Sequence, residues 1–203
     1  MDLKIKLLKW IVIVIVCFLA SIYAGAQTIG VSTNLARWAE LGTMNVEGGY
    51  AFNRHFSVHV NVAINPFTFR AEEADERYED VMANTTRAFQ YKRESVGVGV
   101  RWWPWYVFSG WWLRAKVQYM AYDIGGIQTP QRHVGNAFGV GLGAGYSLML
   151  GQEWNIDFGV AGWGGYRIKD VYESINTNSK PVDNVRGWYL WPEEIVIAIT
   201  YVF

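Results

Sequence analysis

Residues 138–148 alternate strictly between a large apolar residue or alanine and a glycine or serine. A period of two is that of a β-strand, whose side chains point to opposite faces in turn. On the solvent face of a soluble sheet, a row of glycines weakens the strand and returns nothing. Inside a small closed barrel, the same row leaves room for large side chains from other strands. This segment therefore favours a closed β-barrel.

The same period of two recurs after Gln27, without sustained helical spacing. In the final segment, isoleucines and aromatic residues occupy the odd positions from Ile195 to Phe203. Several segments exceed the ~9 to 11 residues that a strand needs to cross a bilayer. The predicted strands are residues 28–38, 43–52, 56–69, 88–103, 110–122, 136–150, 153–169 and 188–203. We therefore expect an all-β fold, an eight-stranded antiparallel transmembrane β-barrel of the outer-membrane type.

The connections between these strands alternate in length, apart from the first one near residues 39–42. The short ones are residues 53–54, 104–109 and 151–152, and the long ones are residues 70–87, 123–135 and 170–187. An even number of strands brings the two ends of the chain to the same side of the barrel. Short turns on one side and long loops on the other are typical of outer-membrane barrels.

The first 26 residues have the composition of a secretory signal peptide. Three lysines precede an apolar run from Trp10 to Ala20, and Ala24-Gly25-Ala26 provides the small residues of a cleavage site. The apolar run is too short for a spanning helix. We expect a signal peptide at residues 1–26 and a single barrel domain at residues 27–203. The only cysteine, Cys17, lies in the signal peptide, so the barrel forms no disulfide.

Charge and motifs argue against several classes of protein. The chain has 203 residues with 18 Lys and Arg against 18 Asp and Glu, which leaves no excess of basic residues for nucleic acid. Glycines at 139 and 141 continue in alternation to Gly145 and do not open a helix, so they do not form a dinucleotide-binding motif. We expect no cofactor, no metal site and no catalytic residue.

The three histidines, His55, His59 and His133, are candidate site residues. His55 and His59 are four residues apart, roughly 13 Å along a strand, which is too far for one metal. Ser57 with His59 and a carboxylate would supply the groups of a nucleophile site. The simpler interpretation is that His59 is an interior residue, that His55 lies at a turn and that His133 lies in a solvated loop.

Aromatic residues gather at two levels of the predicted barrel. Those expected at the level of the short turns are Trp102, Trp103, Trp105, Tyr106, Phe108, Trp111, Trp112 and Trp154. Those expected near the opposite edge are Trp38, Trp163, Trp188 and Tyr189. Two such levels are typical of the aromatic girdles at membrane interfaces.

The faces opposite the apolar ones place charged residues inside the barrel. We expect Glu47 and Asp157 to pair with Arg101, Arg114 and Lys116. Eight strands enclose just enough space for side chains, and unpaired charges there would cost several kcal/mol each. The network would fill the lumen, so we do not expect an open pore.

Short segments along most of the chain form a recognisable set: Ser32 to Leu35, Asn45 to Glu47, Phe56 to Val58, Ile64 to Phe67, Arg101 to Trp103, Gly125 to Ile127, Gly141 to Tyr146 and Trp154 to Ile156. In these segments the chain resembles a family of uncharacterised small outer-membrane barrels from gut and oral Gram-negative bacteria. The terminal Phe203, with Tyr201 two positions before it, resembles the assembly signal of such barrels. The resemblance implies an outer-membrane protein without established activity, sometimes encoded beside fimbrial subunits.

We therefore expect a monomeric, non-enzymatic barrel with a structural or surface-interaction role. Its partners would be outer-membrane lipid and lipopolysaccharide, and a surface or fimbrial protein reached through the loops. Loop 70–87 carries six carboxylates and three arginines, and is read as a solvated charge run. Two alternatives stay open: an envelope enzyme acting on lipid or lipopolysaccharide, and a narrow conduit for small apolar solutes, which a lateral gap would favour.

Overall fold

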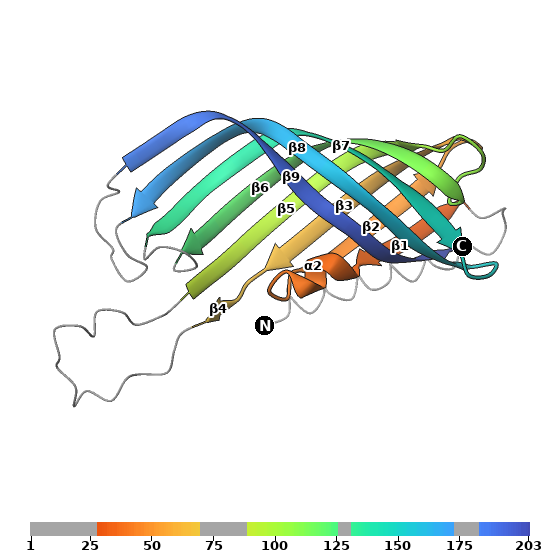
Figure 1. The fold of residues 1–203 in the computed structure, drawn as a ribbon, viewed down its shortest axis with the longest axis horizontal. Helices are drawn as coiled ribbons and strands as arrows, with labels where there is room; N and C mark the ends of the chain where they lie inside the picture. Colours follow the sequence, from red (N-terminus) through yellow and green to blue (C-terminus); the bar gives the residue numbers. More distant parts are fainter. Residues whose placement is uncertain (1–27, 70–88, 126–130, 173–182) are drawn as a thin grey trace, which may run out of the picture.

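The computed structural model describes residues 28–69, 89–125, 131–172 and 183–203, which form a closed eight-stranded antiparallel barrel (Figure 1). The elements are β1 Ile29–Asn34, α2 Leu35–Ala39, β2 Met44–Ala51, β3 Phe56–Asn65, β4 Thr68–Phe69, β5 Phe89–Trp102, β6 Gly110–Gly125, β7 Arg132–Met149, β8 Trp154–Tyr172 and β9 Asp183–Val202. The predicted signal peptide at 1–26 and loop 70–87 lie outside the described residues. No helix within the described ranges is long and apolar enough to cross a membrane.

The barrel closes through two pairings between strands that are not consecutive in the chain. β1 pairs with β9, from Gly30 opposite Val202 to Asn34 opposite Ala198, and β3 pairs with β5. β3 and β4 both pair with β5, one after the other, so the nine strand segments form an eight-stranded barrel. The break between β3 and β4 falls at Pro66, which has no N–H to donate to the ladder. The predicted all-β barrel is confirmed.

The short turns and the C-terminus lie at one end of the barrel, which we call the turn end (Figure 1). Thr28, the first described residue, also lies there, because its backbone N donates to Phe203 O at 2.9 Å. Toward the other end, β6 extends to Gly125 and β7 begins at Arg132, so the loop predicted at 123–135 is shorter than expected. β6, β7 and β8 are long because their alternation of outward and inward residues continues along most of their length.

The predicted strand 28–38 is wrong after Asn34, where the chain enters the short helix α2. The Asn34 side chain caps this helix by accepting from Ala36 N at 3.1 Å. The same side chain also accepts from Ile197 N at 3.1 Å and donates to Ile195 O at 3.0 Å. Asn34 therefore ends the β1–β9 ladder and starts the helix at one point.

The glycine row of β7 faces inward, as predicted, and large side chains from other strands occupy the space that it leaves. A Cβ added at Gly139 would lie 2.6 Å from Trp163 Nε1, and one at Gly145 would collide with the Trp112 ring. On the opposite face of β7, Phe138 and Leu142 are exposed. The alternation therefore separates a bare inner face from an apolar outer face.

A β-bulge in β9, opposite Ala161 and Gly162 of β8, changes which residues face outward. Ile195 and Ile197 on one side of the bulge, and Trp188 and Leu190 on the other, are all exposed. Without an extra residue, these two groups would lie on opposite faces, because side chains alternate along a strand. The bulge therefore lets apolar side chains face outward on both sides of it.

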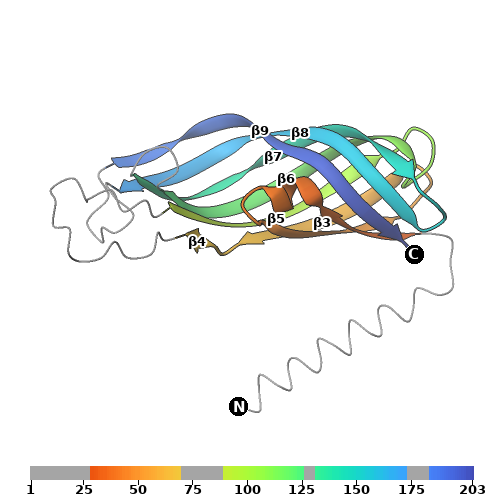
Figure 2. The same cartoon turned by 60° about the horizontal axis from the view of Figure 1, so that its bottom comes forward.

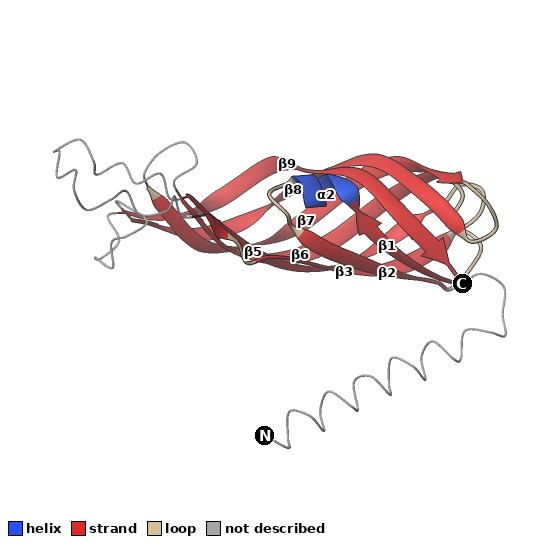
Figure 3. Ribbon diagram, turned by 90° about the horizontal axis from the view of Figure 1, so that it is seen from below, coloured by secondary structure: helices blue, strands red, loops and turns tan. Residues whose placement is uncertain are grey.

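The wall of the barrel is uneven in height. β1 reaches β9 only as far as Ala198, and among the described residues the segment Asp183–Glu194 of β9 pairs with β8 alone. Helix α2 lies between β9 and β2, at the end of this unpaired segment that is nearer the turn end (Figures 2 and 3). Directions away from the turn end are called upward. Above α2, the described barrel wall is therefore incomplete on the β9 side.

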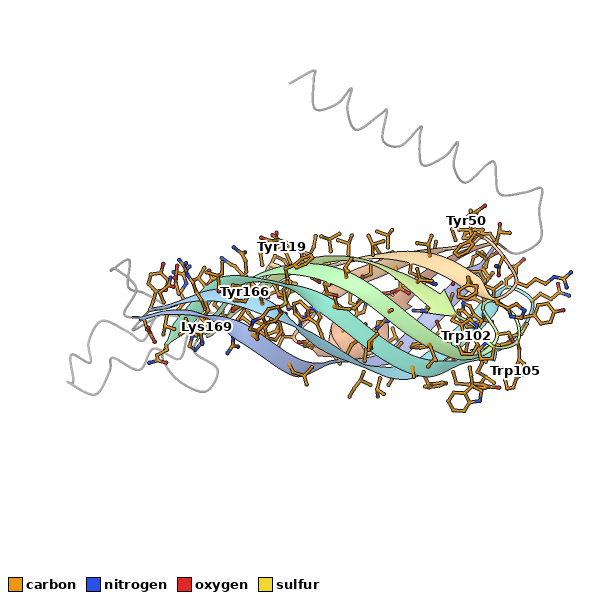
Figure 4. All side chains as sticks on the ribbon, turned by 90° about the horizontal axis from the view of Figure 1, so that it is seen from above. Tyr50, Trp102, Trp105, Tyr119, Tyr166 and Lys169 are labelled. Carbon is orange, nitrogen blue, oxygen red and sulfur yellow. The ribbon has the colours of Figure 1, made fainter. Side chains whose placement is uncertain are left out.

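The predicted aromatic level at the turn end is only partly correct. Trp102, Trp105 and Trp111 are exposed, and Figure 4 shows Trp102 and Trp105 at this end. Three further members, Trp103, Phe108 and Trp112, are instead buried inside the barrel. Neighbours in a strand point to opposite faces, so in each Trp-Trp pair one ring faces outward and the other inward.

The opposite aromatic level is also divided between the two faces. Trp38 and Trp188 are exposed, as predicted, whereas Trp163 is buried. The rings of Trp163 and Tyr189 meet edge to face with centroids 5.0 Å apart, and both side chains line an interior cavity. They cannot belong to an outer girdle.

Candidate functional site

The five charged residues predicted inside the barrel form connected ion pairs at mid-height. Arg101 bonds Glu47 and lies 3.4 Å from Asp157 Oδ2. Arg114 Nη1 lies 3.5 Å from Glu47 Oε2, and Lys116 joins the same cluster through another carboxylate. Strands β2, β5, β6 and β8 each supply residues, so the cluster ties distant parts of the chain together.

The carboxylate that completes this cluster is Glu194, which was not among the predicted residues. Its Oε2 accepts from Arg114 Nη2 at 2.8 Å and from Lys116 Nζ at 3.5 Å. Its Oε1 accepts from Arg37 Nε of α2 at 3.1 Å and from Asn34 Nδ2 at 2.9 Å. The signal for Glu194 was present in the sequence, since it lies two residues before inward-facing Val196. Arg37 had no such signal, because it belongs to a helix.

The cluster closes the lumen at this level. Four cations face three carboxylates, which gives a formal charge of 4 − 3 = +1. The space beside them is a cavity of about 20 Å³, which is the size of one water molecule. We call Arg37, Glu47, Arg101, Arg114, Lys116, Asp157 and Glu194 the charged plug.

A layer of buried aromatic rings lies between the charged plug and the turn end. The Arg101 guanidinium lies 4.7 Å from the centroid of the Trp112 ring, a distance suited to a cation–π contact. Trp103 meets Phe108 edge to face at 5.8 Å. The phenylalanine carbonyl accepts from Asn155 Nδ2 at 2.7 Å. The turn end is thus filled by packed rings and hydrogen bonds.

Ser57, His59 and Glu47 form a hydrogen-bonded chain with the connectivity of a catalytic triad. Ser57 Oγ lies 2.7 Å from His59 Nε2, and His59 Nδ1 lies 3.2 Å from Glu47 Oε1. Such a chain can activate a serine hydroxyl when a substrate reaches it. Here Ser57 is 0% exposed, and its hydroxyl accepts from Trp103 Nε1 at 2.9 Å. Among the described residues, Ser57 lines neither the small cavity beside the charged plug nor the larger interior cavity described below, so neither of these cavities brings a substrate to its hydroxyl.

The other two histidines do not join this chain. His55 Nδ1 lies 3.0 Å from Trp103 O near the turn after β2. His133 opens β7 at the far end, and was wrongly placed in a loop. Within the part of the chain that the structure describes, no group of three or more His, Cys, Asp or Glu side chains is placed to hold a metal.

A second interior space, which we call the upper cavity, lies on the far side of the charged plug from the turn end. Its volume is about 370 Å³. It is lined by Glu40, Tyr91, Arg93, Met120, Tyr122, Ile124, His133, Ala137, Trp163, Arg167, Lys169 and Tyr189. These residues come from β5 to β9 and from the turn after α2. The sequence gives no signal for this space, because the space depends on how far each strand extends beside its neighbours.

The lower border of the upper cavity is held by a carboxylate. Glu40, just after α2, accepts from Tyr91 Oη and pairs with Arg93 Nη1 at 3.2 Å. Arg167 stacks over the Tyr189 ring at 5.8 Å. Among the described residues, neither Arg167 nor Lys169 forms an ion pair. Asp183 is near enough to Lys169 to attract it electrostatically, but no described carboxylate lies within ion-pair distance of either cation.

Comparison with known proteins identifies a family for this chain. No curated protein matches the chain. A family model described as "Protein of unknown function (DUF3575)" matches residues 11–203. This match covers all the strands and every residue of the charged plug. The chain therefore belongs to the family of proteins of unknown function described as DUF3575.

Proposed function

We propose that this protein is a monomeric outer-membrane barrel with a non-enzymatic structural or surface-interaction role. The observation that carries the proposal is the outer surface. Valine, leucine, isoleucine and phenylalanine side chains are exposed on most strands, including Val60, Val98, Val117, Leu142 and Val160. Soluble monomers rarely expose a continuous apolar surface of this extent. Lipid is the surrounding that such a surface fits.

The height of this apolar surface agrees with a bilayer. On β6, Trp111 and Tyr119 are exposed and eight residues apart, and on β8 Trp154 and Tyr166 are exposed and twelve apart. At 3.3 Å per residue and a strand tilt of about 40°, these spans correspond to roughly 20 and 30 Å along the barrel axis. The apolar band of outer-membrane barrels is about 25 Å tall. Figure 4 shows Tyr119 and Tyr166 away from the turn end, where Trp102 and Trp105 lie.

The interior supports a role other than passage of solutes through the whole barrel. The charged plug and the buried rings below it leave about 20 Å³ beside the ion pairs, too little for an aqueous path. A barrel of this kind acts through its surface. We infer contacts with outer-membrane lipid and lipopolysaccharide, and with a surface or fimbrial protein through the loops. The link to fimbriae comes only from the family resemblance.

Two measurements on the refolded mature protein test this proposal. We expect the unheated sample to migrate differently from the heated one on a detergent gel, because a folded barrel resists unfolding by detergent. We expect no steady single-channel conductance in a planar bilayer. A sample that folds in buffer without lipid or detergent would contradict the membrane assignment. Steady conductance would contradict the closed lumen.

An envelope enzyme is the second candidate, and the Ser57–His59–Glu47 chain is the observation that favours it. Its distances are those of a working triad. The burial of Ser57 and its bond from Trp103 oppose this role. A labelling experiment that separates the two functions is given in the Discussion.

A further inference from the structure

We propose that the upper cavity binds an amphiphile with one alkyl chain and one carboxylate head group, a ligand of the fatty-acid class. This goes beyond the structural role proposed above and assigns the barrel a ligand site. The proposal stands on the charge, the apolar lining and the position of the cavity.

The charge of the lining calls for an anion. Arg93, Arg167 and Lys169 contribute three positive charges against one from Glu40, so the formal charge is 3 − 1 = +2. Glu40 is engaged by Arg93, which leaves Arg167 and Lys169 for a ligand. These two residues are two apart on the inner face of β8, about 7 Å along the strand, so one head group can contact both. A carboxylate would receive charge-assisted hydrogen bonds there.

The rest of the lining suits an alkyl chain. Met120, Ile124, Ala137 and Trp163 present apolar surface to the cavity. Its volume of about 370 Å³ lies within the range of small-molecule sites. Two buried polar atoms, Trp163 Nε1 and His133 Nδ1, have no hydrogen-bond partner among the described residues. A mainly apolar space with a few polar groups is the usual composition of a ligand pocket.

Among the described residues, the uneven wall leaves the upper cavity uncovered beside the unpaired edge of β9. Tyr189, which lines the cavity, belongs to the segment of β9 that pairs only with β8 among the described residues. No residue of β1, β2 or β3 is among the described residues that line it. Helix α2 closes the wall below this segment (Figure 3). In a membrane, an amphiphile could enter there without crossing the charged plug.

The test uses the refolded mature protein in nanodiscs of zwitterionic lipid. The probe is a dodecanoate that carries a diazirine on its chain, and cross-linked residues are mapped by mass spectrometry. We expect cross-links to inward residues such as Met120 and Trp163, at least tenfold above those from the matching alcohol probe. Cross-links confined to outward residues such as Leu142 would mean surface lipid contacts only and would overturn the proposal. Equal labelling by the alcohol would overturn the carboxylate assignment.

Variants separate the site from the fold. The double variant Arg167→Gln/Lys169→Gln should lower inward cross-linking at least tenfold. The control Lys92→Gln/Arg186→Gln removes two positive charges from exposed positions and should leave it unchanged. Ala137→Leu places a larger side chain in the cavity and should also reduce inward labelling. Heat-dependent gel mobility is recorded for each variant. Inward labelling that persists in folded Arg167→Gln/Lys169→Gln or Ala137→Leu protein would refute the site.

Discussion

The sharpest test of the interior is Glu194→Gln, which removes one charge and keeps the shape of the side chain. Glu194 accepts from four donors, two at each carboxylate oxygen. Glutamine retains one oxygen, which can still accept from Asn34 and Arg37. Its NH₂ group would then face Arg114 and Lys116, which are donors only. Two charged hydrogen bonds are lost while both cations stay buried.

The cost follows from these contacts. A hydrogen bond to a charged group contributes about 1.5–3 kcal/mol, and breaking a buried ion pair costs about 3–5 kcal/mol. For Glu194→Gln we therefore expect the free energy of unfolding to fall by about 3–5 kcal/mol. At about 2–4 °C per kcal/mol for a chain of this size, the thermal midpoint should fall by about 6–20 °C.

The assay is the midpoint of heat-dependent gel mobility in a non-ionic detergent, supported by tryptophan fluorescence. Glu153→Gln is the control, since Glu153 is exposed and its side chain accepts a hydrogen bond from Tyr201 Oη. Its midpoint should move by less than about 2 °C. Glu194→Gln/Lys116→Met removes a cation as well and should recover part of the loss. An unchanged midpoint in Glu194→Gln, or no recovery in the double variant, would refute the charge argument.

Three further predictions concern other parts of the barrel. Gly145→Ala should lower the free energy of unfolding by about 1–3 kcal/mol, because its Cβ meets the Trp112 ring. The control Gly48→Ala, with no atom within 4 Å of the new Cβ, should leave the free energy of unfolding unchanged. Equal thermal midpoints for the two variants would contradict the packing account. Asn34→Ala should cost about 1–2 kcal/mol through the lost cap, with faster hydrogen exchange at α2 as the readout. A fluorophosphonate serine probe should not label the folded protein, and labelling that disappears in Ser57→Ala would establish the enzyme instead.

Much of the fold followed from alternation alone. The glycines of β7 recur at every second position and all face inward, and the isoleucines at 195, 197 and 199 of β9 recur in the same way on its outer face. This regularity is what distinguished the inner face from the outer face. Alternation within the pairs Trp102-Trp103 and Trp111-Trp112 would also have predicted that Trp103 and Trp112 face inward. Helix α2 was beyond reach, because five residues are too few to show a helical period.

The strand residues of the charged plug could be predicted from the sequence, but Arg37 of α2 and the pairs that the residues form could not. Parity along each strand places Glu47, Arg101 and Arg114 inside. Which of them meet depends on the stagger between strands, and no short motif encodes it. The upper cavity depends further on β1 ending at Asn34 and on the β9 bulge, each of which is a local departure from the regular pattern.

The short closure between the first and last strands has a consequence for how the barrel opens. β1 and β9 share five residue pairs, from Gly30 opposite Val202 to Asn34 opposite Ala198, whereas β8 and β9 share eighteen. β1 shares only these five pairs with β9 and four with β2, so releasing β1 breaks far fewer backbone bonds than separating two neighbouring long strands. We therefore expect local unfolding to begin at β1 and its closure with β9. This seam is where the sheet would join its own ends last during assembly, and where amide hydrogens of the closed wall would exchange first.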